Sequence, residues 1–90
     1  MRVFFTKRAY KSYSRIKDYI RQEWSESVVL AFEQKTVDFL DIIEQFPEMG
    51  QGLRSFLLTS QTRVFYRIKG NQIIILTFFD TRKNPKKKPR

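Results

Sequence analysis

The order of apolar and polar positions along the chain predicts four strands. The longest apolar run, Ile73–Phe79, is β-branched and aromatic, which is typical of a strand buried on both faces. We expect it to be the central strand of the sheet and to carry the residues after it to the surface. Polar and apolar residues alternate over Thr62–Lys69, which predicts a neighbouring strand, and Gly70-Asn71 is a two-residue hairpin signal between the two. Shorter strands are expected at Arg2–Phe5 and Leu53–Leu58.

Two helices are predicted between the first two strands. The first runs from about Lys7 to Glu23 and follows Thr6, a suitable N-cap. The second runs from about Glu26 to Phe46 after the N-cap candidate Ser25. Its buried stripe is expected to contain Val29, Phe32, Thr36, Phe39, Ile43 and Phe46, widened by Leu30, Val37 and Leu40. A coiled coil needs about three to four heptads, so this shorter stripe favours a helical hairpin within the chain. Pro47-Glu48-Met49-Gly50 should stop the helix.

These elements follow one another in the order β-α-α-β-β-β. This order predicts an α+β fold in which a helical hairpin packs on one face of a small antiparallel sheet. Short turns between the last three strands favour a meander, while the first strand could lie at an edge or beside the last strand. We expect a single domain over residues 1–82, followed by a basic, flexible tail at residues 83–90.

The composition excludes several classes of chemistry. The chain has no cysteine and no histidine, so disulfides, thiolate chemistry and the commonest zinc ligand are absent. We therefore expect no metal site and no cofactor, and a reducing cytoplasm as the natural setting. No apolar run approaches the roughly 20 residues that span a membrane, so no membrane partner is expected.

The charge is strongly asymmetric along the chain. Of the net charge of +9, residues 1–48 contribute nothing, with eight basic and eight acidic residues, whereas residues 49–90 hold ten basic residues and one acid, Asp80. This one-sided excess favours an anionic partner such as nucleic acid, a ribosome or an acidic protein. The alternative is a soluble basic domain whose tail is simply solvated.

Several short motifs are spread over residues 2–85 in a characteristic order: Tyr19-Ile20, Phe46-Pro47-Glu48-Met49-Gly50, Leu53-Arg54, Arg63-Val64-Phe65-Tyr66-Arg67-Ile68 and Asp80-Thr81-Arg82-Lys83-Asn84-Pro85. With these motifs the chain resembles the RelE/ParE superfamily of bacterial toxins from type II toxin–antitoxin modules. The resemblance implies a growth-inhibiting toxin of the plasmid stabilisation type, neutralised by a cognate antitoxin. It would exist as a monomer or as a hetero-oligomer with that antitoxin.

The superfamily contains two mechanisms, and the basic residues could serve either. RelE-like members are similar to ribosome-dependent endoribonucleases that cut mRNA, whereas ParE-like members resemble gyrase poisons without nuclease activity. The candidate anion-binding residues are Arg54, Arg63, Arg67, Arg82, Lys83, Lys86, Lys87 and Lys88. Guanidinium groups bind phosphate oxygens in a bidentate fork. In a nuclease, the catalytic residues would be Arg54, Arg63 and Arg82, with Asp80 as the base.

The proton-transfer groups favour the ParE-like mechanism. RNA-cleaving relatives usually carry a tyrosine, often with a histidine, after the last strand, and this chain has neither beyond Tyr66. Tyr66 alternates with apolar neighbours and is expected in the core. Asp80 lies among arginines that favour its ionised form, which makes it a poor base, and we expect it to order Arg82 or the turn. The favoured hypothesis is a non-enzymatic gyrase poison. A RelE-like mRNA endoribonuclease and an inactive nucleic-acid-binding module remain as alternatives.

Overall fold

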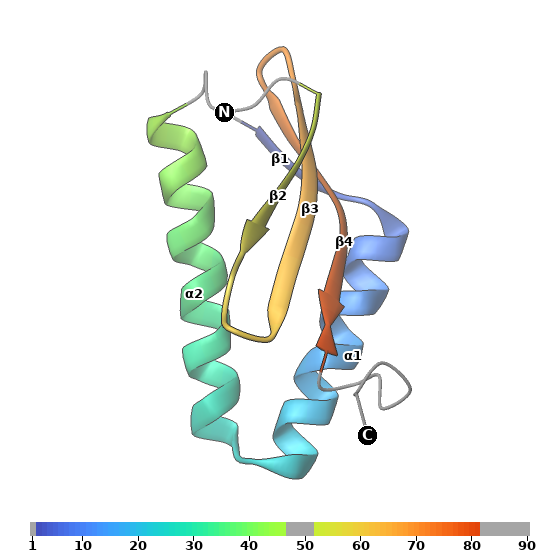
Figure 1. The fold of residues 1–90 in the computed structure, drawn as a ribbon, viewed down its shortest axis with the longest axis vertical. Coiled ribbons are helices and arrows are strands. Elements are labelled where there is room, and N and C mark those ends of the chain that lie inside the picture. The colour runs from blue at the N-terminus through green and yellow to red at the C-terminus, as the bar shows by residue number, and fades with distance from the viewer. Residues whose placement is uncertain (1, 47–51, 82–90) are drawn as a thin grey trace.

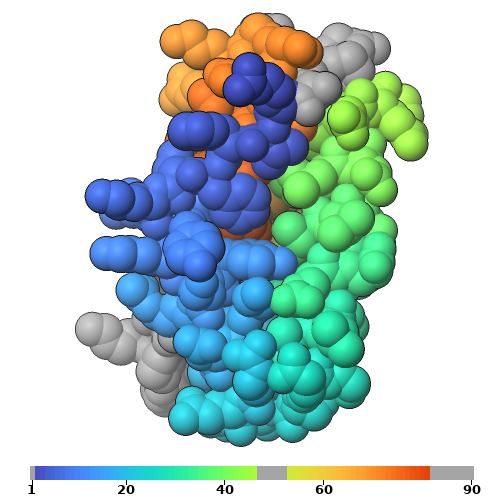
Figure 2. All heavy atoms as spheres, turned by 180° about the vertical axis from the view of Figure 1, so that it is seen from behind, coloured from blue at the N-terminus to red at the C-terminus, as the bar shows by residue number. Residues whose placement is uncertain are grey.

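The computed structural model describes residues 2–46 and 52–81 of the chain. Its elements are β1 (Arg2–Phe5), α1 (Lys7–Glu23), α2 (Glu26–Gln45), β2 (Gly52–Leu57), β3 (Thr62–Lys69) and β4 (Gln72–Asp80). The two helices form a hairpin that covers one face of a four-stranded sheet (Figures 1 and 2). The predicted order of elements and the helical hairpin on a sheet are therefore confirmed. In the described part of the chain, neither helix is long and apolar enough to span a membrane.

Both predicted N-caps are confirmed. The Thr6 hydroxyl accepts a hydrogen bond from the Ala9 amide at 3.0 Å, and the Ser25 hydroxyl accepts one from the Val28 amide at 3.3 Å. Such caps satisfy amides that lack a partner in the first turn of a helix. Thr6 also joins α1 to β4, because its amide and hydroxyl both lie 3.1 Å from the carbonyl oxygen of Ile75. The predicted helix stop at residues 47–50 lies outside the described residues.

The sheet is mixed rather than wholly antiparallel, with the strand order β1-β4-β3-β2. The last three strands form the expected antiparallel meander, but β1 lies at the edge and pairs in parallel with β4, Val3 opposite Ile73. The reason is the short link between β1 and α1. Only Thr6 separates them, so α1 continues in the direction of β1 (Figure 1). Four later reversals of the chain then return β4 to that same direction.

The core lies between the helical hairpin and the helix-facing side of the sheet. Phe39 of α2 is at its centre, with its ring centroid 4.9 Å from that of Phe56 and 5.2 Å from that of Tyr66. Tyr66 is 2% exposed, which confirms that it is a core residue. The buried apolar residues of the described chain are Ala9, Ile16, Ile20, Val29, Phe32, Phe39, Ile43, Leu58, Val64, Tyr66, Ile68, Ile73, Ile75 and Phe78.

The buried stripe of α2 is narrower than predicted. Leu30, Val37 and Phe46 are 58%, 49% and 50% exposed, so the expectation that they belong to the core was wrong. Helix α2 meets α1 and the sheet along one side only, and Leu30 and Val37 lie outside that contact. Phe46 is excluded for a different reason, because the helix ends at Gln45 and Phe46 is its C-cap.

Strand β4 is central in the sheet, but it is not buried on both faces as predicted. Its burial alternates: Ile73, Ile75 and Phe78 are buried against the helices, whereas Phe79 on the other face is 40% exposed. No described element covers that second face. Asp80 continues the helix-facing series and is 4% exposed, so the expectation that the strand delivers it to the surface was also wrong.

Candidate functional site

The face of the sheet turned away from the helices combines cations with exposed apolar side chains. Residues that pair across antiparallel strands lie on the same face, and Leu53 pairs with Arg67 while Leu57 pairs with Arg63. The Arg63 guanidinium donates a hydrogen bond to the Ser55 hydroxyl at 3.0 Å. We call this surface the sheet face; its residues are Leu53, Ser55, Leu57, Arg63, Phe65, Arg67, Lys69 and Phe79. Arg63 and Arg67 therefore share a face, as the alternation in β3 predicted.

Arg54 does not join these two arginines. It pairs with Tyr66, and paired residues share a face, so it lies on the helix-facing side. Burial raises the pKa of the Tyr66 hydroxyl, and the nearby Arg54 charge opposes that rise. The sheet thus separates Arg54 from Arg63 and Arg67, which corrects the expectation of one arginine cluster. Arg82 and the tail lysines at 83 and 86–88 lie outside the described residues.

Asp80 is held inside the fold, on the opposite side of the sheet from Arg63 and Arg67. The Thr62 hydroxyl, itself fully buried, donates a hydrogen bond of 2.5 Å to the Asp80 carboxylate. Just beyond it, the Thr81 amide donates to the Gln61 carbonyl at 3.0 Å. These contacts join the end of β4 to the start of β3. The position of Asp80 is that of a residue that organises the strand end.

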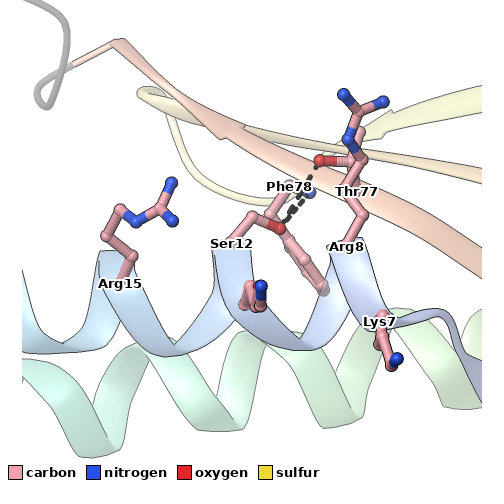
Figure 3. A pocket seen from close by; sticks show the side chains of 7 residues that line it. Lys7, Arg8, Ser12, Arg15, Thr77 and Phe78 are labelled. Carbon is pink, nitrogen blue, oxygen red and sulfur yellow. Dashed lines mark hydrogen bonds between the residues drawn. The ribbon is translucent and has the colours of Figure 1, made fainter.

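A second basic surface, whose residues are not among the predicted site residues, lies between α1 and β4. It is a cleft of about 470 Å³ lined by Lys7, Arg8, Lys11, Ser12, Arg15, Thr77 and Phe78, and we call it the α1–β4 cleft. Figure 3 shows Arg8 and Arg15 rising from α1 on either side of Ser12, toward β4. The four basic side chains are exposed. The available signal was the basic first turn of this helix, where the helix dipole disfavours cations.

The α1–β4 cleft exists because β1 covers only the first part of the β4 edge. The pairing with β1 ends at Ile75, and α1 then lies against the remaining edge. There the Ser12 hydroxyl accepts a hydrogen bond from the Phe78 amide at 3.0 Å and lies 3.5 Å from the Thr77 hydroxyl. A register shift in the β3–β4 ladder, beside residue 76, accompanies this change of neighbour.

A shallower hollow adjoins the cleft along α1. Its volume is about 350 Å³ and it is lined by Tyr10, Lys11, Ser14, Arg15 and Asp18. Because Lys11 and Arg15 line both hollows, the two form one continuous basic track. The single acid, Asp18, accepts a hydrogen bond from Arg21 at 3.1 Å. Within residues 2–46 and 52–81, no group of acidic residues is placed to hold a metal ion.

Comparison with known proteins identifies relatives of this chain. Residues 3–85 match the family model described as the ParE toxin of the type II toxin–antitoxin system parDE. The structure is similar to one from the chromosomal ParDE system of P. aeruginosa, with 22% identity, a TM-score of 0.71, and coverage of 89% of this chain and 95% of that chain. It is also similar to a YoeB/ParE toxin from Agrobacterium tumefaciens, with 15% identity, a TM-score of 0.64, and coverage of 89% and 98%. At these identities the structural likeness shows a shared fold. Curated protein sequences contain no match.

Proposed function

The chain belongs to the ParE toxin family of type II toxin–antitoxin systems, and from this premise we propose that it inhibits growth by binding DNA gyrase without cleaving nucleic acid. We further propose that it acts in the cytoplasm and that a cognate antitoxin, encoded beside it, neutralises it. The observation that carries the proposal is the separation of Asp80 from Arg63 and Arg67. Asp80 is buried on the helix-facing side of the sheet, whereas Arg63 and Arg67 are exposed on the sheet face.

This separation bears directly on catalysis. Cleavage of RNA through its 2′-hydroxyl needs a proton acceptor within hydrogen-bond reach of the substrate, besides charge that stabilises the phosphorane. Arg63 and Arg67 provide the charge, but Asp80 and Tyr66 are buried behind the sheet. Burial also raises the Tyr66 pKa, which disfavours its use as a base. The described residues of the sheet face therefore suit binding better than proton transfer.

The composition of the sheet face suits a protein partner. Interface cores are enriched in aromatic residues and arginine and depleted in lysine and acids. Leu53, Leu57 and Phe79 are 58%, 53% and 40% exposed beside the two arginines, which matches that description. We propose that gyrase contacts this face, and that Arg82, Lys83, Lys86, Lys87 and Lys88 extend the contact from the end of a single domain over residues 1–82.

The proposal is tested by measuring both candidate activities with the same purified chain. In one reaction, gyrase and supercoiled plasmid are treated with the chain and then with detergent and protease, which reveals trapped double-strand breaks as linear DNA. In the other, an mRNA translated by purified ribosomes is mapped for cuts. We expect linear DNA and an intact mRNA.

A pair of charge reversals locates the contact. Arg67→Glu on the sheet face should reduce gyrase trapping at least about tenfold, because loss of a central charged anchor costs about 2 kcal/mol or more. Lys35→Glu makes the same type of change on an exposed position of α2 and should leave trapping unchanged. Cuts in the mRNA with normal gyrase would instead assign the RelE-like mechanism, and no effect in either reaction would assign an inactive binding module.

A further inference from the structure

Three of the four basic residues of the α1–β4 cleft form one row on α1. Arg8, Lys11 and Arg15 are spaced i, i+3 and i+7, which places them on one side of α1, and Lys7 lies one turn before Lys11. From Lys7 to Arg15 the chain contains four cations and no acid. Figure 3 shows the side chains of Arg8 and Arg15 directed toward β4 rather than away from it.

The four cations from Lys7 to Arg15 lower the local stability of α1. The first turn contains no acid, although the helix dipole disfavours cations there. Like charges four residues apart, such as Lys7 with Lys11 and Lys11 with Arg15, also destabilise a helix. Helix α2, by contrast, begins with Glu26. An anionic ligand in the cleft would attract each of these cations and so offset the unfavourable interactions among them.

We propose that the α1–β4 cleft binds the phosphodiester backbone of DNA. The distance along the helix from Arg8 to Arg15 is about 10 Å, from a rise of 1.5 Å per residue. One DNA strand advances about 3.4 Å per phosphate along its axis, so a row of this length parallel to that axis spans about three phosphate steps. Ser12 and Thr77, whose hydroxyls line the cleft between the cations, are of the kinds that hydrogen-bond phosphate oxygens.

The contacts of the cleft favour a nucleic acid over an acidic peptide. A peptide strand adding to the sheet would need free backbone groups on the β4 edge. Here the Ser12 hydroxyl already accepts from the Phe78 amide, and the Thr6 hydroxyl lies 3.0 Å from the Leu76 carbonyl oxygen. The lining is also cationic and hydroxylic, and its aromatic ring, Phe78, is 4% exposed. That composition is typical of protein–DNA interfaces rather than of protein–protein interface cores.

The adjoining hollow extends the same track. Lys11 and Arg15 line both hollows, and Tyr10, which lines the second one, is 67% exposed. An exposed aromatic ring among cations is a stacking surface for a base or sugar. The second hollow therefore adds a stacking surface beside Lys11 and Arg15 but also includes an acid, Asp18. The basic lining suits a chain that runs from Arg8 to Arg15 rather than a single ion.

The α1–β4 cleft and the sheet face share no residue, so each can bind its own ligand. One toxin molecule can therefore contact gyrase through the sheet face while α1 contacts the DNA that gyrase holds. The identification of this DNA as gyrase-bound rests on the proposed function. Backbone binding in the cleft does not depend on it.

The test measures direct binding of the purified full-length chain to a fluorescein-labelled 20-base-pair DNA duplex in the absence of gyrase. Binding is monitored by fluorescence anisotropy at NaCl concentrations from about 0.05 to 0.3 M. In a plot of the logarithm of the binding constant against the logarithm of the salt concentration, loss of one phosphate contact makes the slope shallower by about 0.9. This change corresponds to about eightfold weaker binding at 0.1 M salt. We expect this change for Arg15→Ala and for Lys11→Ala. Arg15→Lys should restore most of the affinity, and circular dichroism verifies that each variant is folded.

The matched control is Lys35→Ala, which removes one positive charge from an exposed position of α2 and should change the affinity less than twofold. Equal losses for Arg15→Ala and Lys35→Ala would overturn the proposal, because binding would then reflect net charge alone. Tighter, Arg15-dependent binding of a polyglutamate peptide would assign the cleft to an acidic protein instead, and tighter binding of a matched RNA duplex would refute the assignment to DNA. If gyrase is unaffected while DNA binding shows the expected losses, the proposed function fails and this inference stands.

Discussion

The buried hydrogen bond between Thr62 and Asp80 should make a measurable contribution to stability. Thr62→Val replaces the hydroxyl by a methyl group of similar size and removes the donor that lies 2.5 Å from the carboxylate. Thr62 and Asp80 are 0% and 4% exposed, so water does not readily replace the lost bond. The substitution therefore tests whether Asp80 organises the end of β4.

The magnitude follows from the type of bond and its burial. A hydrogen bond to a charged group contributes about 1.5–3 kcal/mol, and the added methyl group of valine returns up to about 0.8 kcal/mol through burial. Thr62→Val should therefore lower the free energy of unfolding by about 1–2 kcal/mol. For a domain of this size, 1 kcal/mol shifts the thermal midpoint by about 4–8 °C, so a fall of about 4–16 °C is expected.

The assay is urea denaturation in a double-mutant cycle. In an Asp80→Ala background the acceptor is gone, so Thr62→Val should be neutral or slightly stabilising, which gives a coupling free energy of about 1.5–3 kcal/mol. Thr81→Val is the matched control: its exposed hydroxyl lies 3.5 Å from the Gln61 carbonyl oxygen, and its cost should stay below about 0.5 kcal/mol. Equal costs of Thr62→Val in both backgrounds would refute the reasoning.

A substitution of Asp80 itself distinguishes a structural role of this residue from a catalytic one. Asp80→Asn preserves the shape of the side chain but removes its charge. At a temperature where the variant is folded, it should still trap gyrase, because the carboxylate lies on the opposite side of the sheet from Arg63 and Arg67. A folded Asp80→Asn variant that loses all activity would instead identify Asp80 as a reacting group.

Two further predictions concern the cleft and the core. Ser12→Ala removes the acceptor of the Phe78 amide, so it should cost about 1 kcal/mol in urea unfolding and speed hydrogen exchange of that amide; unchanged exchange would contradict the contact. Phe39 is 1% exposed, so Phe39→Ala should lower the free energy of unfolding by about 3–5 kcal/mol. Phe46 is 50% exposed, so Phe46→Ala should lower it by less than about 1 kcal/mol. Similar losses for both variants would contradict the narrow buried stripe on α2.

Local signals in the sequence were sufficient for the elements themselves. Thr6 and Ser25 begin the helices because a side-chain oxygen at that position can cap the first turn, and this requires no knowledge of the rest of the fold. The alternation in Thr62–Lys69 likewise placed Tyr66 in the core and Arg63 on the opposite face, because successive side chains of a strand point to opposite sides.

Properties that depend on how elements meet were not accessible from those signals. Whether Arg54 shares a face with Arg63 depends on the register between β2 and β3, which a one-residue shift reverses. The parallel pairing of β1 follows from the number of chain reversals after it, and the exposure of Leu30 follows from which side of α2 the sheet occupies. Each is a relation between segments rather than a property of one.

The charge of the chain shows the same division. The sequence determined that residues 49–90 are strongly basic and that residues 1–48 have no net charge. The zero net charge of residues 1–48 gave no indication of the four cations from Lys7 to Arg15. Only the tertiary structure decided that these cations line the α1–β4 cleft, while the acids that balance them lie elsewhere. The physical reason is that local periodicity depends on the chain alone, whereas an anion site requires charges that packing brings to one place.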